Sequence, residues 1–223
     1  MKKKILVFSA HPDDETLGCG GYIKKLSNNN HTSVCIFTTG ITSRKNYKKN
    51  EVSNLKKNAL KAFTILGFKK NIFLNLDDNK LDGYPLLKIV KLVEEIIKKE
   101  KPNIIFTHFP DDLNVDHKTV TEAVLTASRP IKQNNFIDKI FFYETLSSTE
   151  WSINKKFCPN TYIDIKDTIK FKLKAIKSYK SELKLFPHPR SVKGIEILAQ
   201  KRGSEVNMKF AEAFMLYRDV SKI

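Results

Sequence analysis

Short apolar runs alternate along this chain with longer stretches in which apolar residues recur at helical spacing. Strand-like runs lie near residues 5–9, 33–38, 72–76, 104–107, 139–143 and 162–165, and helical patterns lie near 15–27, 52–66, 86–100, 120–127, 168–179 and 191–201. Strand–helix alternation is typical of a parallel sheet covered by helices on both faces. We therefore predict a Rossmann-like three-layer α/β/α sandwich with a C-terminal extension of helix and strand.

Length and cysteine usage limit the class of protein further. The 223 residues contain no repeat and no linker, so we expect one domain over 1–223. The three cysteines are far apart and form no Cys-x-x-Cys pair, which favours a reducing compartment. The first apolar run is too short for a signal peptide, and no run is long enough to span a membrane. We expect a cytoplasmic protein.

The net charge of +16 could suit nucleic acid, a membrane surface or anionic small molecules. The lysines are scattered in pairs and triples, and no stripe of arginines alternates with aromatic residues. This pattern favours a solvated surface over a nucleic-acid interface, so we expect no nucleic-acid partner. Nucleic-acid binding remains a weaker alternative, which would require an affinity that falls steeply with salt.

Polar residues with metal-binding chemistry follow the first and fourth expected strands. His11, Asp13 and Asp14 come directly after the first, and Asp116 and His117 lie in the region after the fourth. In the common doubly wound strand order these two strands are neighbours, and ligands bind beyond their carboxyl ends. We therefore expect His117 to lie near His11 and Asp14.

Two imidazoles and a carboxylate around an open position are typical of catalytic zinc, which lowers the pKa of bound water to about 7. Consecutive aspartates cannot easily both face one ion, so one would be a ligand and the other a general base. Alternatively, Asp13 or Asp14 simply caps the next helix, and His117 is an ordinary surface or capping residue. The combination of residues favours the metal site. We expect His108 to be structural and His31 to be exposed.

Residues 10–15 and the glycines that follow them resemble the first motif of the LmbE/PIG-L family of zinc-dependent N-deacetylases. These enzymes remove acetyl groups from N-acetylglucosamine units. Asp116-His117-Lys118 resembles the second motif of the family. Residues 172–181 resemble its late helix, and residues 202–203 with 211–214 resemble its C-terminal motif. The resemblance therefore extends over most of the chain.

The resemblance implies that His11, Asp14 and His117 are zinc ligands and that Asp13 is the general base. It also implies that Arg44, after the second strand, binds substrate. Asp116 is expected to contact the ligands rather than the ion.

The chain departs from the family where a histidine usually precedes the ligand histidine by three residues. Asn114 occupies that position. An asparagine can donate a hydrogen bond to an oxyanion, but it cannot carry a proton. Asp13 or His188 would then have to protonate the leaving amine.

The segment between two prolines that carries His188 also carries Arg190. It is either a rigid connector or a lid whose arginine holds an anionic group of the substrate. Trp151, the only tryptophan, falls in an expected loop. We expect it to pack in the core or an interface rather than against a sugar.

The resulting expectation is a zinc-dependent hydrolase that removes the N-acetyl group from an N-acetylglucosamine-like conjugate, nucleotide-linked or glycan-linked. The alternative is a weakly active or inactive protein of the same fold that binds such a sugar. The resemblance leaves a homo-oligomer open.

Overall fold

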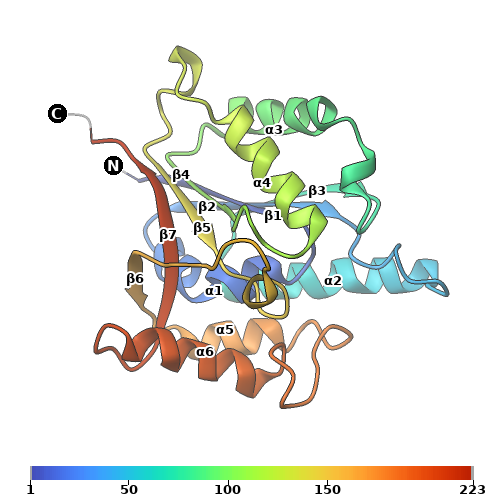
Figure 1. Cartoon of the computed structure of the whole chain (residues 1–223), viewed down its shortest axis with the longest axis vertical. Coiled ribbons are helices and arrows are strands. Elements are labelled where there is room, and N and C mark those ends of the chain that lie inside the picture. The colour runs from blue at the N-terminus through green and yellow to red at the C-terminus, as the bar shows by residue number, and fades with distance from the viewer. Residues whose placement is uncertain (1, 222–223) are drawn as a thin grey trace.

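The computed structural model describes residues 2–221, and in that range seven strands form one sheet (Figure 1). The strands are β1 (Lys4–Ser9), β2 (His31–Thr38), β3 (Lys70–Leu76), β4 (Ile104–His108), β5 (Lys139–Tyr143), β6 (Thr161–Asp164) and β7 (Ala211–Asp219). Their order is β3-β2-β1-β4-β5-β7-β6. Neighbours among the first five strands are parallel, whereas β7 is antiparallel to both β5 and β6. The predicted parallel α/β sheet is confirmed.

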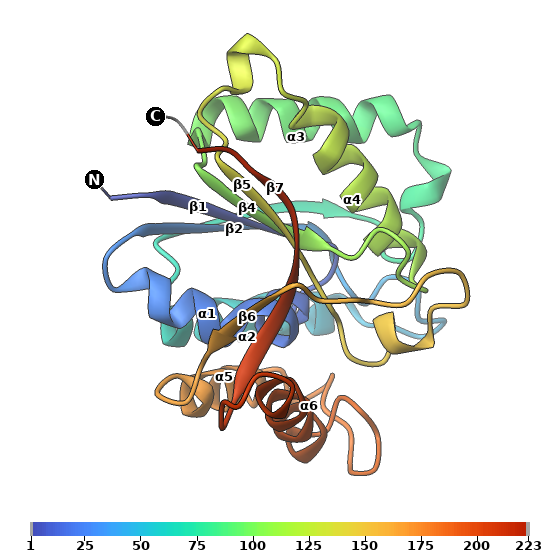
Figure 2. The ribbon, with the colours of Figure 1, turned by 60° about the vertical axis from the view of Figure 1, so that its left-hand side comes forward.

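Helices cover both faces of the sheet. They are α1 (Asp14–Ser27), α2 (Lys49–Leu66), α3 (Leu86–Glu100), α4 (Val115–Ala127), α5 (Ile169–Ile176) and α6 (Val192–Ser204). Figure 2 shows α3 and α4 on one face and α1 and α2 on the other, with α5 and α6 lying outside α1 and α2. The C-terminal extension therefore adds a partial further layer beyond the three-layer sandwich. None of the helices in residues 2–221 has the length and apolar character needed to cross a bilayer.

Local sequence explains where several helices lie. Helix α3 buries Ile89, Val93 and Ile97 against the sheet, as their helical spacing predicts. Helix α2 ends at Gly67, whose φ of 86° is readily adopted by a residue without a Cβ. Both helices occupy the predicted stretches.

The C-terminal region differs from the prediction in two places. Helix α5 ends at Ile176, three residues early, because the chain turns there and carries Tyr179 to a buried hydrogen bond with Glu15 (2.7 Å). Strand β7 was not predicted as a strand at all. It pairs with β5 and β6, so its partners are distant in sequence and local periodicity does not report them.

The core packs α1 very closely against β5. A Cβ at Gly18 would overlap the ring of Tyr143, whose hydroxyl donates to the Phe8 carbonyl (2.9 Å). Since α1 begins directly after β1, this contact helps to place the first turn of the helix at the carboxyl end of the sheet.

Candidate active site

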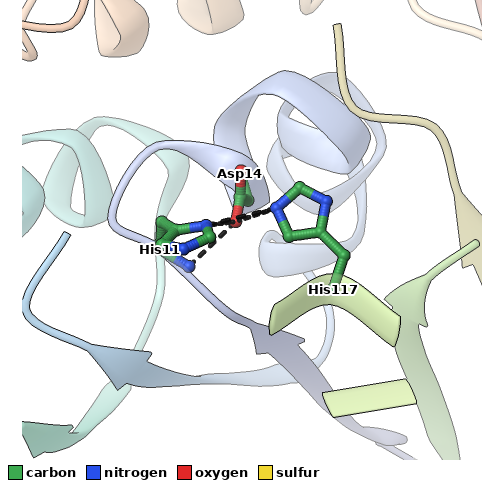
Figure 3. A group of neighbouring side chains, drawn as sticks. All are labelled: His11, Asp14 and His117. Atoms are coloured by element: carbon green, nitrogen blue, oxygen red, sulfur yellow. Dashed lines mark hydrogen bonds and ion pairs between the residues drawn. The ribbon is translucent and has the colours of Figure 1, made fainter. Parts of the chain in front are cut away.

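The predicted neighbours are in place at the carboxyl ends of β1 and β4, which pair in parallel. His11 lies in the turn after β1, Asp14 begins α1, and His117 lies in the first turn of α4. Figure 3 shows the three side chains converging from these separate elements. The pairing of β1 with β4 therefore brings together His11 and His117, which are more than one hundred positions apart in the sequence.

One donor atom from each residue lies close to the other two. His11 Nδ1 is 3.2 Å from Asp14 Oδ2 and 3.2 Å from His117 Nε2, and His117 Nε2 is 3.3 Å from Asp14 Oδ2. Ligands about 2.0–2.1 Å from a tetrahedral zinc ion are about 3.3 Å from one another. The spacing and chemistry of the three donors therefore fit such an ion.

The electrostatics of the group also favour a cation. Burial alone would lower the pKa of His117, but the neighbouring Asp14 and Asp112 raise it to about 9. Burial opposes the charged form of His11 as well, yet its hydrogen bonds to Asp116, Asp14 and Asp78 hold its pKa well above the usual value. Carboxylates that stabilise protonated imidazoles would equally stabilise a metal ion in the same place.

The far side of the His11 ring faces two buried carboxylates. His11 Nε2 is 3.1 Å from Asp116 Oδ2 and 3.1 Å from Asp78 Oδ1. Asp116 also accepts from the backbone N–H groups of Asn79 (2.7 Å) and Leu81 (3.0 Å). Asp116 thus joins α4, the segment after β3 and the His11 ring.

Asp78 was missed by the sequence analysis. It follows β3 and lies in an Asp-Asp-Asn stretch that resembles an ordinary turn. Its place after the carboxyl end of a third parallel strand is the signal that could have identified it. His11, Asp78 and Asp116 form a second group of close donor atoms that shares His11 with the first.

The imidazole ring of His117, like that of His11, lies against a buried carboxylate. His117 Nδ1 lies 3.0 Å from Asp112 Oδ1, and the hydroxyls of Ser148 and Thr149 donate to the same carboxylate. Burial would raise the pKa of Asp112, but these hydrogen bonds and the charge of His117 lower it to about 2. Asp112 is therefore ionised and orients the ring.

Asp13 is adjacent to Asp14 but does not belong to either donor group. It stands before α1 with a φ of 118°, and its side chain makes no capping hydrogen bond. A left-handed conformation in a residue other than glycine costs roughly 1–3 kcal/mol and is found most often at functional sites. Burial, followed by the charge of Asp14, raises the pKa of Asp13 well above its usual value. The capping explanation does not account for this residue.

A cavity of about 190 Å³ opens over the group and reaches both predicted arginines. Arg44 Nη2 donates to both carboxylate oxygens of Glu182 (2.8 and 2.9 Å), and Arg190 Nη1 lies 3.5 Å from Asp13 Oδ2. Glu182, which the sequence analysis did not select, lines the cavity. His188 is not among the described residues that line it, and its Nδ1 accepts from the backbone of Arg190 (3.1 Å).

Asn114 lines the cavity and also caps α4. Its Oδ1 accepts from the backbone N–H groups of Asp116 (2.8 Å) and His117 (3.3 Å), and its Nδ2 donates to Asn79 Oδ1 (3.1 Å). The amide oxygen can only accept, whereas the Nδ2 group has two hydrogens, so Nδ2 can donate to a substrate as well as to Asn79.

Three other sequence expectations have clear outcomes. His108 is fully buried, stacks on His117 with ring centroids 3.9 Å apart and accepts from the Ala10 backbone (2.9 Å), so it supports a neighbouring ring. His31 is exposed, as expected. Trp151 is 49% exposed, so it does not pack in the core, and packing in an interface stays a prediction.

The fold and this group define an α/β protein with a candidate hydrolytic centre at the carboxyl edge of its sheet. The chain belongs to the PIG-L family, because the family model described as GlcNAc-PI de-N-acetylase matches residues 6–128. The resemblance read from the motifs is thereby confirmed.

Similar proteins agree with this assignment. The chain is 30% identical to the uncharacterized deacetylase YaiS of Escherichia coli, over 81% of this chain and 92% of the relative. It is 29% identical to the diacetylchitobiose deacetylase of Thermococcus kodakarensis, over 81% and 70%. The structure of the N,N'-diacetylchitobiose deacetylase from Pyrococcus horikoshii superposes with a TM-score of 0.78 at 24% identity, covering 97% of this chain and 84% of that one, which shows a shared fold.

Proposed function

We propose that this protein is a zinc-dependent N-deacetylase that hydrolyses the acetamide of an N-acetylglucosamine-like conjugate. The observation that carries the proposal is the His11, Asp14 and His117 donor group beside a buried carboxylate, Asp13, that does not belong to it. Membership of a de-N-acetylase family and similarity to a diacetylchitobiose deacetylase support the reaction and the class of substrate.

The donor set supports zinc as the metal. His11 and His117 offer one ring nitrogen each and Asp14 offers one carboxylate oxygen, which leaves a fourth position for water or substrate. A zinc ion held by these residues would supply Lewis acidity toward the amide carbonyl oxygen and lower the pKa of water. Asp78, Asp112 and Asp116 would orient the imidazoles from behind.

Asp13 is the residue placed to move protons. Its carboxylate would take the proton of the attacking water and return one to the amide nitrogen as the C–N bond breaks, which yields acetate and a free amine. A raised pKa suits a group that must serve as base and then as acid. Asn114 Nδ2 would donate to the carbonyl oxygen as negative charge develops there. His188, outside the cavity, has no part in this scheme.

The two arginines are proposed to bind the rest of the substrate. Arg44 and Arg190 both line the cavity, and each already lies beside a carboxylate, Glu182 and Asp13 respectively. An anionic group on the sugar conjugate, such as a phosphate, would compete for these guanidinium groups. This arrangement favours a nucleotide-linked or otherwise charged acetamido sugar.

A second candidate is a protein that binds such a sugar without hydrolysing it. Asn114 motivates it, because this residue cannot carry a proton and its oxygen is engaged in capping α4. That candidate predicts that the sugar conjugate raises the melting temperature while no acetate is released, even after zinc is restored.

The unpaired cysteines support a cytoplasmic location. Cys19 and Cys35 are buried and Cys158 is exposed, and all three are free thiols in the structure. An exposed free thiol is typical of a reducing compartment.

The two aspartates provide the test. Asp14→Ala should lose bound zinc, whereas Asp13→Asn should keep zinc and lose turnover by about 10²–10⁴-fold. Elemental analysis and an acetate-release assay on free and nucleotide-linked N-acetylglucosamine conjugates measure both properties. Asp77→Asn, at an exposed aspartate beside the site, is the matched control and should change neither. Full activity in Asp13→Asn would overturn the assignment of the base.

A further inference from the structure

Glu15 follows the two aspartates of the first motif and is fully buried, with 0% of its surface exposed. It belongs to neither group of close donor atoms. The three groups that donate hydrogen bonds to it within residues 2–221 are all uncharged: the Asp13 N–H and the hydroxyls of Thr16 and Tyr179. A carboxylate buried with only neutral partners is costly for folding. Glu15 is therefore a poor choice of residue for stability alone.

The side chain of Glu15 reaches back to the backbone of Asp13. Glu15 Oε2 accepts from the Asp13 N–H (3.1 Å). The Asp13 carbonyl in turn accepts from the N–H groups of Thr16 (3.0 Å) and Leu17 (2.9 Å). The two peptide groups that flank the Asp13 Cα atom are thereby both held. Because these peptide groups set φ and ψ, they also set the direction in which the Asp13 side chain leaves the chain.

An aspartate does not readily adopt this backbone conformation without support. Asp13 has a φ of 118° and a ψ of −29°, and such a conformation persists only where the surrounding structure enforces it. In an ordinary capping box a glutamate also binds the N–H of the N-cap residue, but the N-cap side chain caps the helix in return. The Asp13 side chain makes no capping hydrogen bond and lines the cavity instead.

Tyr179 fixes the other end of the Glu15 carboxylate. Glu15 Oε1 accepts from the Tyr179 hydroxyl (2.7 Å) and from the hydroxyl of its neighbour Thr16. Tyr179 is fully buried and lies in the turn after α5, 164 positions further along the chain. The Glu15 carboxylate cannot turn away from Asp13 without breaking these buried hydrogen bonds. A C-terminal residue therefore controls a side chain of the first motif.

We propose that Glu15 and Tyr179 are positioning residues for the reaction: Tyr179 fixes Glu15, and Glu15 holds the backbone of Asp13 so that the Asp13 carboxylate stays in the cavity. This role rests on the proposed function, in which Asp13 is the base. A displacement of about 1 Å in a catalytic group can cost about 10²-fold in rate. Tyr179 acts only through Glu15, since it is not among the described residues that line the cavity.

A purely structural role of Tyr179 would have a different kinetic effect. The Tyr179 carbonyl accepts from the N–H groups of Glu182 (2.9 Å) and Leu183 (3.2 Å), so Tyr179 begins the turn that carries Glu182 to Arg44. If its hydroxyl only anchored this turn, loss of the hydroxyl would act on substrate binding through Arg44 and would raise KM. Displacement of the base would instead lower kcat.

Tyr179→Phe separates these two roles, because the phenylalanine ring still fills the core. We expect kcat for acetate release to fall by about tenfold, since one hydrogen bond to a charged carboxylate is lost, while KM and bound zinc stay unchanged. Tyr22→Phe is the matched control: it removes a hydroxyl from another ring of the same apolar cluster and should change none of the three quantities. An unchanged kcat in Tyr179→Phe, or a loss of zinc that accounts for the lower rate, would overturn the inference.

A double variant tests whether Tyr179 acts through Asp13. Once Asp13→Asn has removed the base, the added Tyr179→Phe change should not slow acetate release further. Effects of the two changes that multiply would contradict the inference and leave the proposed function intact. Full activity of Asp13→Asn by itself would instead contradict the proposed role of the base.

Exchange of the Asp13 amide hydrogen with solvent, followed by NMR, tests the contact without catalysis. The Asp13 N–H is held by the Glu15 carboxylate, so its exchange should be about tenfold faster or more in Tyr179→Phe. The amide of Val7, in the central strand β1, is the internal reference and should exchange equally in both proteins. Equal exchange at Asp13 would overturn the inference, even in a protein that releases no acetate.

Discussion

Asp116 shows how a residue that does not face the candidate ion can still determine the site. Its carboxylate is fully buried and accepts from His11 Nε2 and from two backbone N–H groups of the segment after β3. A carboxylate behind a ligating imidazole fixes the orientation of the ring and increases its basicity. The same backbone hydrogen bonds tie Asp116 to the segment that carries Asp78, whose Oδ1 lies 3.1 Å from the same His11 Nε2 atom.

Asp116→Asn should therefore weaken zinc binding by about 10–100-fold without removing any ligand. Asparagine has the same shape as aspartate, but its side chain is uncharged. It therefore cannot offer ionised oxygens to His11, Asn79 and Leu81. Competition with a chelator of known affinity measures the change. Asp111→Asn is a suitable control, since Asp111 is partly exposed and its only ion-pair neighbour in the described structure is Lys155 at 3.9 Å. An unchanged affinity in Asp116→Asn would show that Asp116 does not orient His11.

At the scale of elements, α1 is the helix on which the site depends most, because it supplies Asp14 and lies directly on β5. The approach is possible only because Gly18 has no side chain where the Tyr143 ring packs. Gly20 lies two residues further along the same helix, and a Cβ there would make ordinary contacts at 3.5 Å with Thr16 and Leu66. The two glycines therefore have different structural roles.

Gly18→Ala and Gly20→Ala should change stability in opposite directions. Overpacking against Tyr143 should make Gly18→Ala less stable by about 1–3 kcal/mol. Gly20→Ala should be more stable by about 0.5–1 kcal/mol, because alanine favours the helix. Chemical denaturation of both variants measures the two effects. Equal stability of the two variants would show that α1 can move away from β5 without a loss of folding stability.

At the scale of the whole molecule, a buried ion pair connects the C-terminal elements α5 and β7 to helix α1. Lys172 on α5 donates to Glu212 of β7 (2.7 Å) and to the Leu17 carbonyl of α1 (2.7 Å). Glu212 also accepts from the backbone N–H groups of Gly21 and Tyr22 (2.8 and 2.7 Å). One apolar cluster includes residues from β1 and α2 as well as from α5 and α6. We infer that residues 1–223 are one domain.

Lys172→Met should lower the free energy of unfolding by about 3–5 kcal/mol, because it leaves the Glu212 carboxylate buried without its cation. Lys174→Met, at an exposed position of the same helix, should have little effect. Thermal unfolding measures both, and the unchanged protein should unfold in a single transition. Two separate transitions would indicate that the C-terminal extension folds as a unit of its own.

Much of the fold could be predicted from sequence because its central elements are locally encoded. Helix α3 has an apolar face, a terminating Lys101-Pro102 pair and the predicted bounds. Strand β7 and the early end of α5 depend on contacts with β5, β6 and Glu15 that are far away in the chain. Periodicity reports which face of an element is apolar, but not which distant element covers it.

The residues of the candidate site also fall into two sets: those that the sequence predicted and those that only the structure identified. The sequence by itself predicted the donor group. The common strand order places the motif after β1 beside the Asp-His pair after β4, and the family resemblance selects His11, Asp14 and His117. Only the tertiary structure decided what surrounds it: Asp78 and Asp112 behind the imidazoles, Glu182 on Arg44, Asn114 engaged in its cap, and His188 outside the cavity. The physical reason is that strand order follows from chain topology, whereas the packing of loops after different strands depends on side-chain contacts that have no period in the sequence.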